Sequence, residues 1–150
     1  MNDDNLKLKN QLCFPLYAAA KEVVRQYKPL LDRLGLTYTQ YITLMVLWEH
    51  ESINVKTLGQ YLYLDSGTLT PLLKRLEQSG YLLRVRSKDD ERNVMITLTD
   101  AGKNLKKEAL SIPEQIVRCL PLSPEEAKTL YQLLYKILDS ENCAIKKTDA

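Results

Sequence analysis

The segment 64–78, LDSGTLTPLLKRLEQ, constrains the fold most, because it predicts one helix with two opposed faces. Asp65 and Ser66 are both favourable N-cap residues at its start. Apolar side chains recur at helical spacing and form one stripe for burial: Leu69, Leu72, Leu73 and Leu76. The opposite face carries side chains that reach base edges and phosphates: Thr68, Thr70, Lys74, Arg75 and Gln78. Proline costs little only in the first turn of a helix. Pro71 lies beyond that turn and therefore predicts a local distortion.

Two alternating runs follow this helix and predict a β-hairpin with a charged tip at 88–92, KDDER. Apolar and basic residues alternate in the first run, and apolar residues share one face in the second: Leu83, Arg84, Val85 and Arg86, then Val94, Ile96 and Leu98. A short helix, a polar-faced helix and a basic hairpin together predict a mainly α fold with a small β-hairpin wing. This is a winged helix-turn-helix, which places its helix in the major groove of DNA and its wing along the backbone or minor groove.

Each feature taken alone has an ordinary explanation. A polar helix face is usually only solvated, and a charged hairpin tip protects a sheet edge from aggregation. The net charge of +2 does not itself indicate a nucleic-acid partner, but between residues 66 and 92 six basic side chains stand against four acidic ones. The features occur side by side and in this order, and together they favour DNA binding.

Composition excludes several other classes. A chain of 150 residues makes one domain, or one domain with a dimerisation element. No apolar run has membrane-spanning length and the N-terminus lacks a signal-peptide core, so we expect a cytoplasmic protein. Three cysteines far apart in sequence and a single histidine offer too few ligands for a metal site, and we expect no cofactor.

Helical segments flank the core on both sides. Spacing over 12–34 predicts a first helix with Pro15 in its first turn and a kink or break at Pro29. The other helix signals are a capping box at 37–40, a short helix over 56–64, a cap at Thr99, an interruption at Pro113 and a start at Ser123. We assign 37–98 to a winged-helix DNA-binding core, 8–34 and 99–140 to dimerisation helices, and 141–150 to a tail.

These flanking helices predict a homodimer. So small a core cannot bury all of their apolar faces within one chain, whereas pairing with a second copy can. A twofold dimer presents two reading helices to a pseudo-palindromic site on double-stranded DNA.

Cys13 is the candidate reactive thiol. It falls at or just before a helix N-terminus, where unpaired N–H groups and the helix dipole favour a thiolate. Tyr17 follows one turn later on the same face, where its phenol can donate to that thiolate. Cys143 lies in a polar tail and lacks such surroundings. The alternative for any cysteine in a reducing compartment is the role of a small buried hydrophobe.

Three stretches resemble the MarR family of winged-helix repressors, and within it the organic-hydroperoxide-sensing, OhrR-like branch. They are NQLCFPLYAAAKEV, RQYKPLLDRLGLTYTQYITLMVLWEHE and LDSGTLTPLLKRLEQSGYLLRVRSKDDERNVMITLTDAGK. The similarity covers about 8–107 and thins out in the last two helical regions. LDSGTLTPLLKR and DERNV are typical of the whole family, and LCFxLY is typical of the thiol-sensing branch. Pro15 is a departure from the motif.

The resemblance implies a homodimeric repressor that releases its operator when Cys13 is oxidised by an organic hydroperoxide or a related oxidant. It places tyrosines around that thiol, some of them across the dimer interface: Tyr17, Tyr27 and Tyr38. It assigns the major-groove helix to Ser66, Thr68, Thr70, Pro71, Lys74 and Arg75. In the wing, Arg92 would enter the minor groove with Asp90 positioned to hold it, and Arg86 belongs to the same basic hairpin.

The branch contains two mechanisms, and both remain open for this chain. One-cysteine members form a sulfenic acid that a small thiol caps, whereas two-cysteine members close a disulfide between subunits. Cys119 lies about where the second cysteine is expected, which favours a Cys13–Cys119 disulfide, with a core position for Cys119 as the alternative. A nearby thiol condenses with a sulfenic acid and so protects the sensor from over-oxidation.

Two other functions compete with redox sensing. Nine tyrosines make an aromatic pocket plausible, so a MarR-type repressor relieved by a small aromatic ligand at the dimer interface is the alternative. A thiol peroxidase acting through Cys13 is the third hypothesis. No base beside the cysteine, phosphate loop or metal cluster supports an enzyme, and we expect none.

Overall fold

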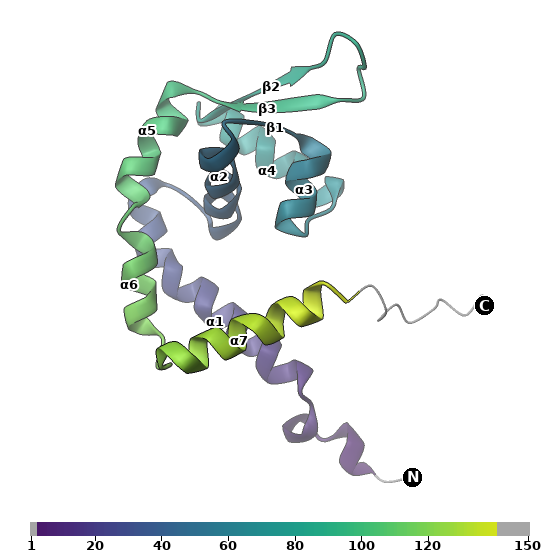
Figure 1. Ribbon diagram of the computed structural model, residues 1–150, viewed down its shortest axis with the longest axis vertical. Helices are drawn as coiled ribbons and strands as arrows, with labels where there is room; N and C mark the ends of the chain where they lie inside the picture. The colour runs from purple at the N-terminus through teal and green to yellow at the C-terminus, as the bar shows by residue number, and fades with distance from the viewer. Residues whose placement is uncertain (1–2, 141–150) are drawn as a thin grey trace, which may run out of the picture. The chain divides into compact units, whose positions relative to one another are not determined.

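The computed structural model describes residues 3–140 of the chain (Figure 1). Cys143 and the expected tail at 141–150 lie outside the described residues. The α-helices are α1 (Cys13–Leu31), α2 (Tyr38–His50), α3 (Val55–Leu62), α4 (Ser66–Gln78), α5 (Asp100–Ala109), α6 (Ile112–Cys119) and α7 (Pro124–Leu138). The strands are β1 (Ser52–Asn54), β2 (Leu82–Arg86) and β3 (Val94–Leu98), and the 3-10 turns are η1 (Asp3–Leu6), η2 (Leu8–Asn10) and η3 (Asp32–Leu34). The chain forms two compact units, Met1–Ile116 and Val117–Ala150.

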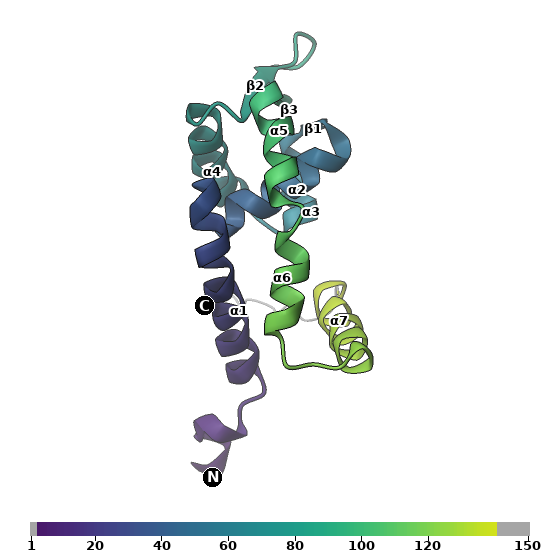
Figure 2. The same cartoon turned by 90° about the vertical axis from the view of Figure 1, so that its left-hand side faces the viewer.

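The first unit contains the winged helix-turn-helix and confirms the predicted fold class. Its core joins α2, α3, α4 and the sheet through leucine and isoleucine side chains that are almost completely buried: Leu44, Leu47, Leu58, Leu69, Leu73, Leu76, Leu82 and Ile96. The hairpin of β2 and β3 extends beyond these helices in both views (Figures 1 and 2). The wing is therefore anchored at its base and free to reach a partner at its tip.

The sheet has three antiparallel strands rather than the two of the expected hairpin. Its order is β1-β3-β2, so β3 is central, and Ile53 of β1 stands opposite Ile96 of β3. The sequence marks 52–55 only as extended. Its pairing follows from Ile53, whose burial against the core requires the strand to lie along the free edge of β3.

In β2, the apolar residues of the alternating run face away from the core. Leu83 and Val85 are exposed, whereas Leu82 is buried and Arg84 is partly buried. Leu82 sets this register, because a shift of one residue would turn every side chain of the strand to the other face. Arg84 consequently points to the side of α4.

Caps begin most of the helices where the sequence predicts. Side chains of Thr37, Asp65, Thr99 and Ser123 each accept a hydrogen bond from a backbone N–H of the first turn. Of the two N-cap candidates for α4, Asp65 is the cap and Ser66 is the first helical residue. These caps set the start of α4, and so the residues that its exposed face presents.

The prolines of the helices are compatible with the helices that contain them. Pro15 is in the first turn of α1, as predicted, and Pro71 lies inside α4 without ending it. Of the kink or break expected at Pro29, the break does not occur, because α1 continues to Leu31 and only then tightens into η3. The interruption expected near Pro113 separates α5 from α6, and this proline sits in the first turn of α6.

Apolar side chains remain uncovered on the helices assigned to dimerisation. On α1 these are Phe14, Leu16, Tyr17 and Val24, and on α7 they are Leu130, Tyr131, Leu133, Tyr135, Ile137 and Leu138. No residue of α7 is buried. Within 3–140, none of the helices combines the length and apolar character needed to cross a bilayer.

Candidate functional site

Helix α4 presents the polar face that the sequence predicts. Its apolar stripe is buried, while the side chains expected to meet DNA are exposed: Ser66, Thr68, Thr70, Pro71, Lys74 and Arg75. The Asp65 carboxylate accepts a hydrogen bond of 2.7 Å from the Thr68 backbone N–H. That bond holds the pKa of Asp65 below its usual value, so the cap is ionised at neutral pH.

Thr70, one of the residues predicted to contact DNA, uses its hydroxyl proton within the helix. The Thr70 hydroxyl donates to the Ser66 backbone carbonyl at 2.8 Å. Its proton is therefore used within the helix, and Thr70 offers a methyl group and an acceptor oxygen outward. A methyl group and an acceptor suit the edge of thymine or of an amino-bearing base.

The wing tip is held by Asp90 through the backbone. The Arg92 backbone N–H donates to Asp90 Oδ1 at 2.9 Å, and the Asn93 N–H donates to the Asp90 carbonyl at 2.9 Å. The resemblance implies that Asp90 holds Arg92, and the structure assigns that hold to the Arg92 main chain. The Arg92 side chain is exposed, and the turn that Asp90 holds sets its direction.

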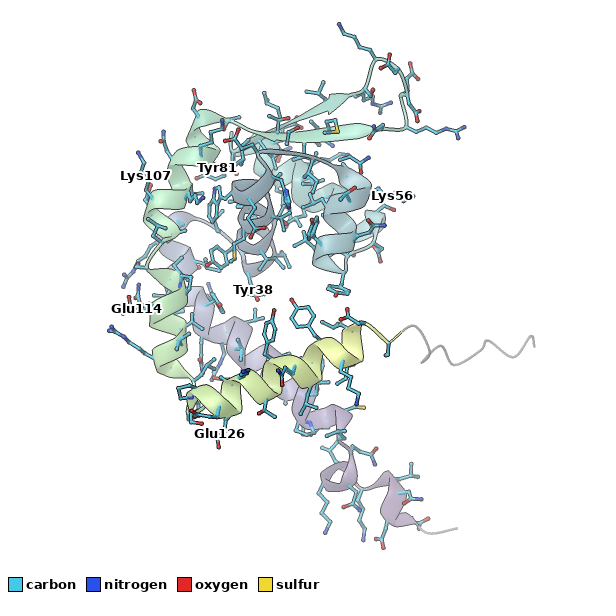
Figure 3. The ribbon with its side chains drawn as sticks, viewed as in Figure 1. Tyr38, Lys56, Tyr81, Lys107, Glu114 and Glu126 are labelled. Atoms are coloured by element: carbon cyan, nitrogen blue, oxygen red, sulfur yellow. The ribbon has the colours of Figure 1, made fainter. Side chains whose placement is uncertain are left out.

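A groove of about 830 Å³ separates α4 from the wing. The predicted residues Ser66, Thr70, Arg86 and Arg92 line it, which brings both reading elements to one concave surface. Sequence reasoning missed the side of α3 that lines the same groove, with Lys56, Gln60 and Tyr63. Figure 3 shows Lys56 at the outer side of α3. The signal available was the polar face that alternates with Leu58 and Leu62.

Cys13 is the first residue of α1, at the helix N-terminus where the sequence predicts it, and it is exposed. Tyr17 lies one turn later and is also exposed, with Lys21 Nζ 5.2 Å from the centre of its ring. Cys119 is the last residue of α6 and is exposed in the single chain. It belongs to the second unit.

Tyr27 and Tyr38 form an aromatic cluster away from Cys13. Their ring centres lie 4.8 Å apart, and Tyr41 packs 5.8 Å from Tyr27. Tyr27 follows Cys13 by 14 residues of the same helix, a rise of about 21 Å, so one subunit does not bring these groups together. Tyr41 is a member of this cluster that was not predicted from the sequence.

Burial controls the ionisation of this cluster. It raises the pKa of Tyr27 to about 12, with a further contribution from Tyr38 and Tyr41, and it raises the pKa of Tyr38 and Tyr41 as well. The phenols are therefore neutral at physiological pH.

Alkaline stability should depend on Tyr27. Its pKa in the folded state lies above the unfolded value of about 10, so its contribution is complete below pH 10 and is lost as pH rises toward 12. We expect Tyr27→Phe to lose less unfolding free energy than wild type across that window, measured by urea denaturation at several pH values. Tyr17→Phe, which removes the hydroxyl of an exposed tyrosine, is the control. Parallel behaviour of the two variants would contradict the burial argument.

Comparisons with known proteins agree with the family resemblance that the sequence shows. The family model described as transcriptional regulator SarA/Rot matches residues 25–109. The organic hydroperoxide resistance transcriptional regulator of Bacillus subtilis (strain 168) is 53% identical over 137 residues, which is 91% of this chain and 93% of that protein.

The solved structures of AbfR, a Staphylococcus epidermidis protein, match in three states. Reduced AbfR bound to DNA has a TM-score of 0.75 at 38% identity and covers 91% of this chain and 94% of its own. Overoxidised AbfR bound to DNA has a TM-score of 0.74 at 39% identity (92% and 97% covered), and disulfide-formed AbfR has 0.63 at 38% (91% and 96%). The chain therefore belongs to the SarA/Rot family of winged-helix transcriptional regulators, a family of DNA-binding proteins and not of enzymes, as its resemblance to the organic-hydroperoxide branch of the MarR family predicts.

Proposed function

We propose that this protein is a redox-switched repressor that leaves its operator when Cys13 is oxidised by an organic hydroperoxide or a related oxidant. The observation that carries the proposal is the position of Cys13, an exposed thiol on the first residue of a helix of 19 residues. An oxidant reaches such a thiol without unfolding the chain. The reduced, overoxidised and disulfide-formed structures of AbfR support a redox signal, and the organic hydroperoxide resistance regulator of B. subtilis supports an organic hydroperoxide as the oxidant.

The DNA-binding form is a homodimer located in the cytoplasm. The uncovered apolar side chains of α1 and α7 supply the surface that a second copy buries. A twofold axis then sets two α4 helices about 34–36 Å apart, one turn of DNA, on a pseudo-palindromic operator. Phosphates are neutralised by Lys74, Arg75 and Arg86. Arg92 enters the minor groove, and base edges are read by Thr68 and Thr70.

The chemistry of the switch has two steps. The Cys13 thiolate attacks the hydroperoxide, the O–O bond breaks to give a sulfenic acid and an alkoxide, and the alkoxide takes a proton from water to become the alcohol. The Cys119 thiol of the partner subunit then attacks the sulfenic sulfur, forms the disulfide and releases water. The disulfide requires the two Cα atoms within about 7 Å, so it fixes one arrangement of the dimerisation helices. That overoxidised AbfR was solved bound to DNA supports a switch driven by the cross-link rather than by oxidation of sulfur alone.

The first experiment compares wild type, Cys13→Ser, Cys119→Ser and Cys143→Ser after one equivalent of cumene hydroperoxide. Non-reducing electrophoresis and DNA affinity are measured on the same samples, with a duplex selected from a random library by the reduced wild type. We expect a covalent dimer only in wild type and Cys143→Ser, and there an increase in dissociation constant on the order of 100-fold that dithiothreitol reverses. Cys13→Ser should keep its affinity after oxidant.

Other results separate the alternatives. Loss of wild-type binding without a covalent dimer would contradict the disulfide and leave Cys13 as a one-cysteine sensor. Binding untouched by the oxidant would contradict redox switching altogether. In that case, release of Cys13→Ser from DNA by a small phenol would support the aromatic-ligand repressor.

A further inference from the structure

Glu77 and Arg84 connect the DNA-reading helix to the wing. Glu77 lies in the last turn of α4, and Arg84 is the central residue of β2. The Arg84 backbone N–H donates to Glu77 Oε1 at 3.1 Å, and Arg84 Nε donates to Glu77 Oε2 at 2.8 Å. Arg84 Nη2 lies 2.7 Å from the same Oε2. One carboxylate therefore holds both the main chain and the side chain of the strand.

This contact differs from an ordinary surface ion pair. Both side chains are about two-thirds covered, with exposed fractions of 31% for Glu77 and 30% for Arg84. The guanidinium and backbone hydrogen bonds from Arg84 lower the pKa of Glu77, so the carboxylate is ionised at neutral pH. A pair with two side-chain contacts and a backbone bond has one defined geometry, unlike a single exposed contact.

The Glu77–Arg84 pair lies where it can control the orientation of the wing. Arg84 stands opposite Ile96 of β3, so a contact that fixes Arg84 fixes both strands. Arg86 follows two residues later in β2, and Arg92 lies at the tip. Rotation of the hairpin about its base would move both arginines relative to α4, across the groove that they share with Ser66 and Thr70.

We propose that Glu77 is a positioning residue for DNA recognition, which sets the angle between α4 and the wing through Arg84. The proposal rests on the DNA-binding surface assigned above. It gives a role to an acidic residue on a helix that approaches a polyanion. Glu77 does not contact DNA in this scheme and acts only through the strand.

Electrostatics and positioning predict opposite signs for Glu77→Gln. Removal of a negative charge beside DNA raises affinity if charge alone matters. Loss of the hold on Arg84 weakens binding, because the wing arginines no longer meet the minor groove and backbone together with α4. We expect the dissociation constant of the reduced protein to rise about tenfold and the salt dependence of binding to become shallower.

The design separates this effect from general damage. Glu108→Gln, on the exposed side of α5, removes the same charge and is the matched control; its affinity should be unchanged or slightly higher. Arg92→Ala is added in wild-type and Glu77→Gln backgrounds, and its cost should shrink in the second, because the wing contact is already lost. Thermal unfolding confirms that each variant folds, and the duplex selected by wild type is the probe.

The outcomes are distinct. Weaker binding by Glu77→Gln with a reduced cost of Arg92→Ala supports the proposal. Equal or tighter binding by Glu77→Gln, or full additivity with Arg92→Ala, overturns it while leaving DNA binding by wild type intact. Failure of reduced wild type to bind any duplex would instead remove the proposed function, and this inference with it.

Discussion

Replacing Leu73 by alanine should cost about 2–5 kcal/mol of unfolding free energy. Leu73 lies on the buried side of α4 with 1% of its surface exposed, and its truncation leaves a cavity that the surrounding core cannot fill. The loss is a large share of the roughly 5–15 kcal/mol that holds a domain folded. Urea denaturation at fixed protein concentration measures it, because dimerisation also contributes to stability.

The neighbouring Lys74→Ala variant is the matched control, since Lys74 is on the exposed face of the same turn. We expect stability within about 0.5 kcal/mol of wild type, but weaker DNA binding and a salt slope reduced by about 1 per subunit. If Leu73→Ala and Lys74→Ala lost stability and DNA affinity in the same proportion, α4 would not have one face for the core and another for DNA.

Gly102→Ala should destabilise the protein by about 3 kcal/mol or more, at the upper end of what overpacking costs. A Cβ at this position would overlap the Tyr81 carbonyl oxygen and lie 2.8 Å from Leu98 Cδ2. The first of these atoms belongs to the backbone, so α5 and the base of the wing must move apart. Tyr81 lies where the sheet meets α5 (Figure 3). The midpoint of thermal unfolding should fall on the order of 10 °C.

Gly67→Ala provides the opposite case in the same unit. Its Cβ would meet only Asp65 Oδ1 at 3.4 Å, and alanine is the better helix former by roughly 1 kcal/mol. We expect unchanged or higher stability. A Gly102→Ala protein that unfolds at the temperature of Gly67→Ala would contradict the close approach of α5 to the wing base.

Sequence patterns predicted the elements that local chemistry determines. The caps at Thr37, Thr99 and Ser123 and the stripe of α4 depend on residues within a few positions of each other, and all of them are confirmed. The third strand was not predicted, because the pairing of Ile53 with Ile96 joins positions 43 apart. Pairings over that range depend on tertiary packing rather than on propensity.

The site divides in the same way. The exposed residues of α4 follow from helical periodicity, and the position of Cys13 follows from a helix start that puts Pro15 in the first turn, so both were found. The lining of the groove by Lys56, the Glu77–Arg84 contact and the main-chain role of Asp90 depend on how separate elements meet. No spacing rule within one element contains that information.

Trp48 gives the protein a built-in optical probe at one junction. It is the single tryptophan of the chain, its indole N–H donates to the Gly102 carbonyl at 2.9 Å, and its ring lies edge-on to Tyr41 at 6.3 Å. All tryptophan fluorescence therefore originates between α2 and α5, beside the tyrosine cluster. Because indole emission responds to hydrogen bonding and polarity, the unlabelled protein reports on that junction during titration with DNA or with an oxidant.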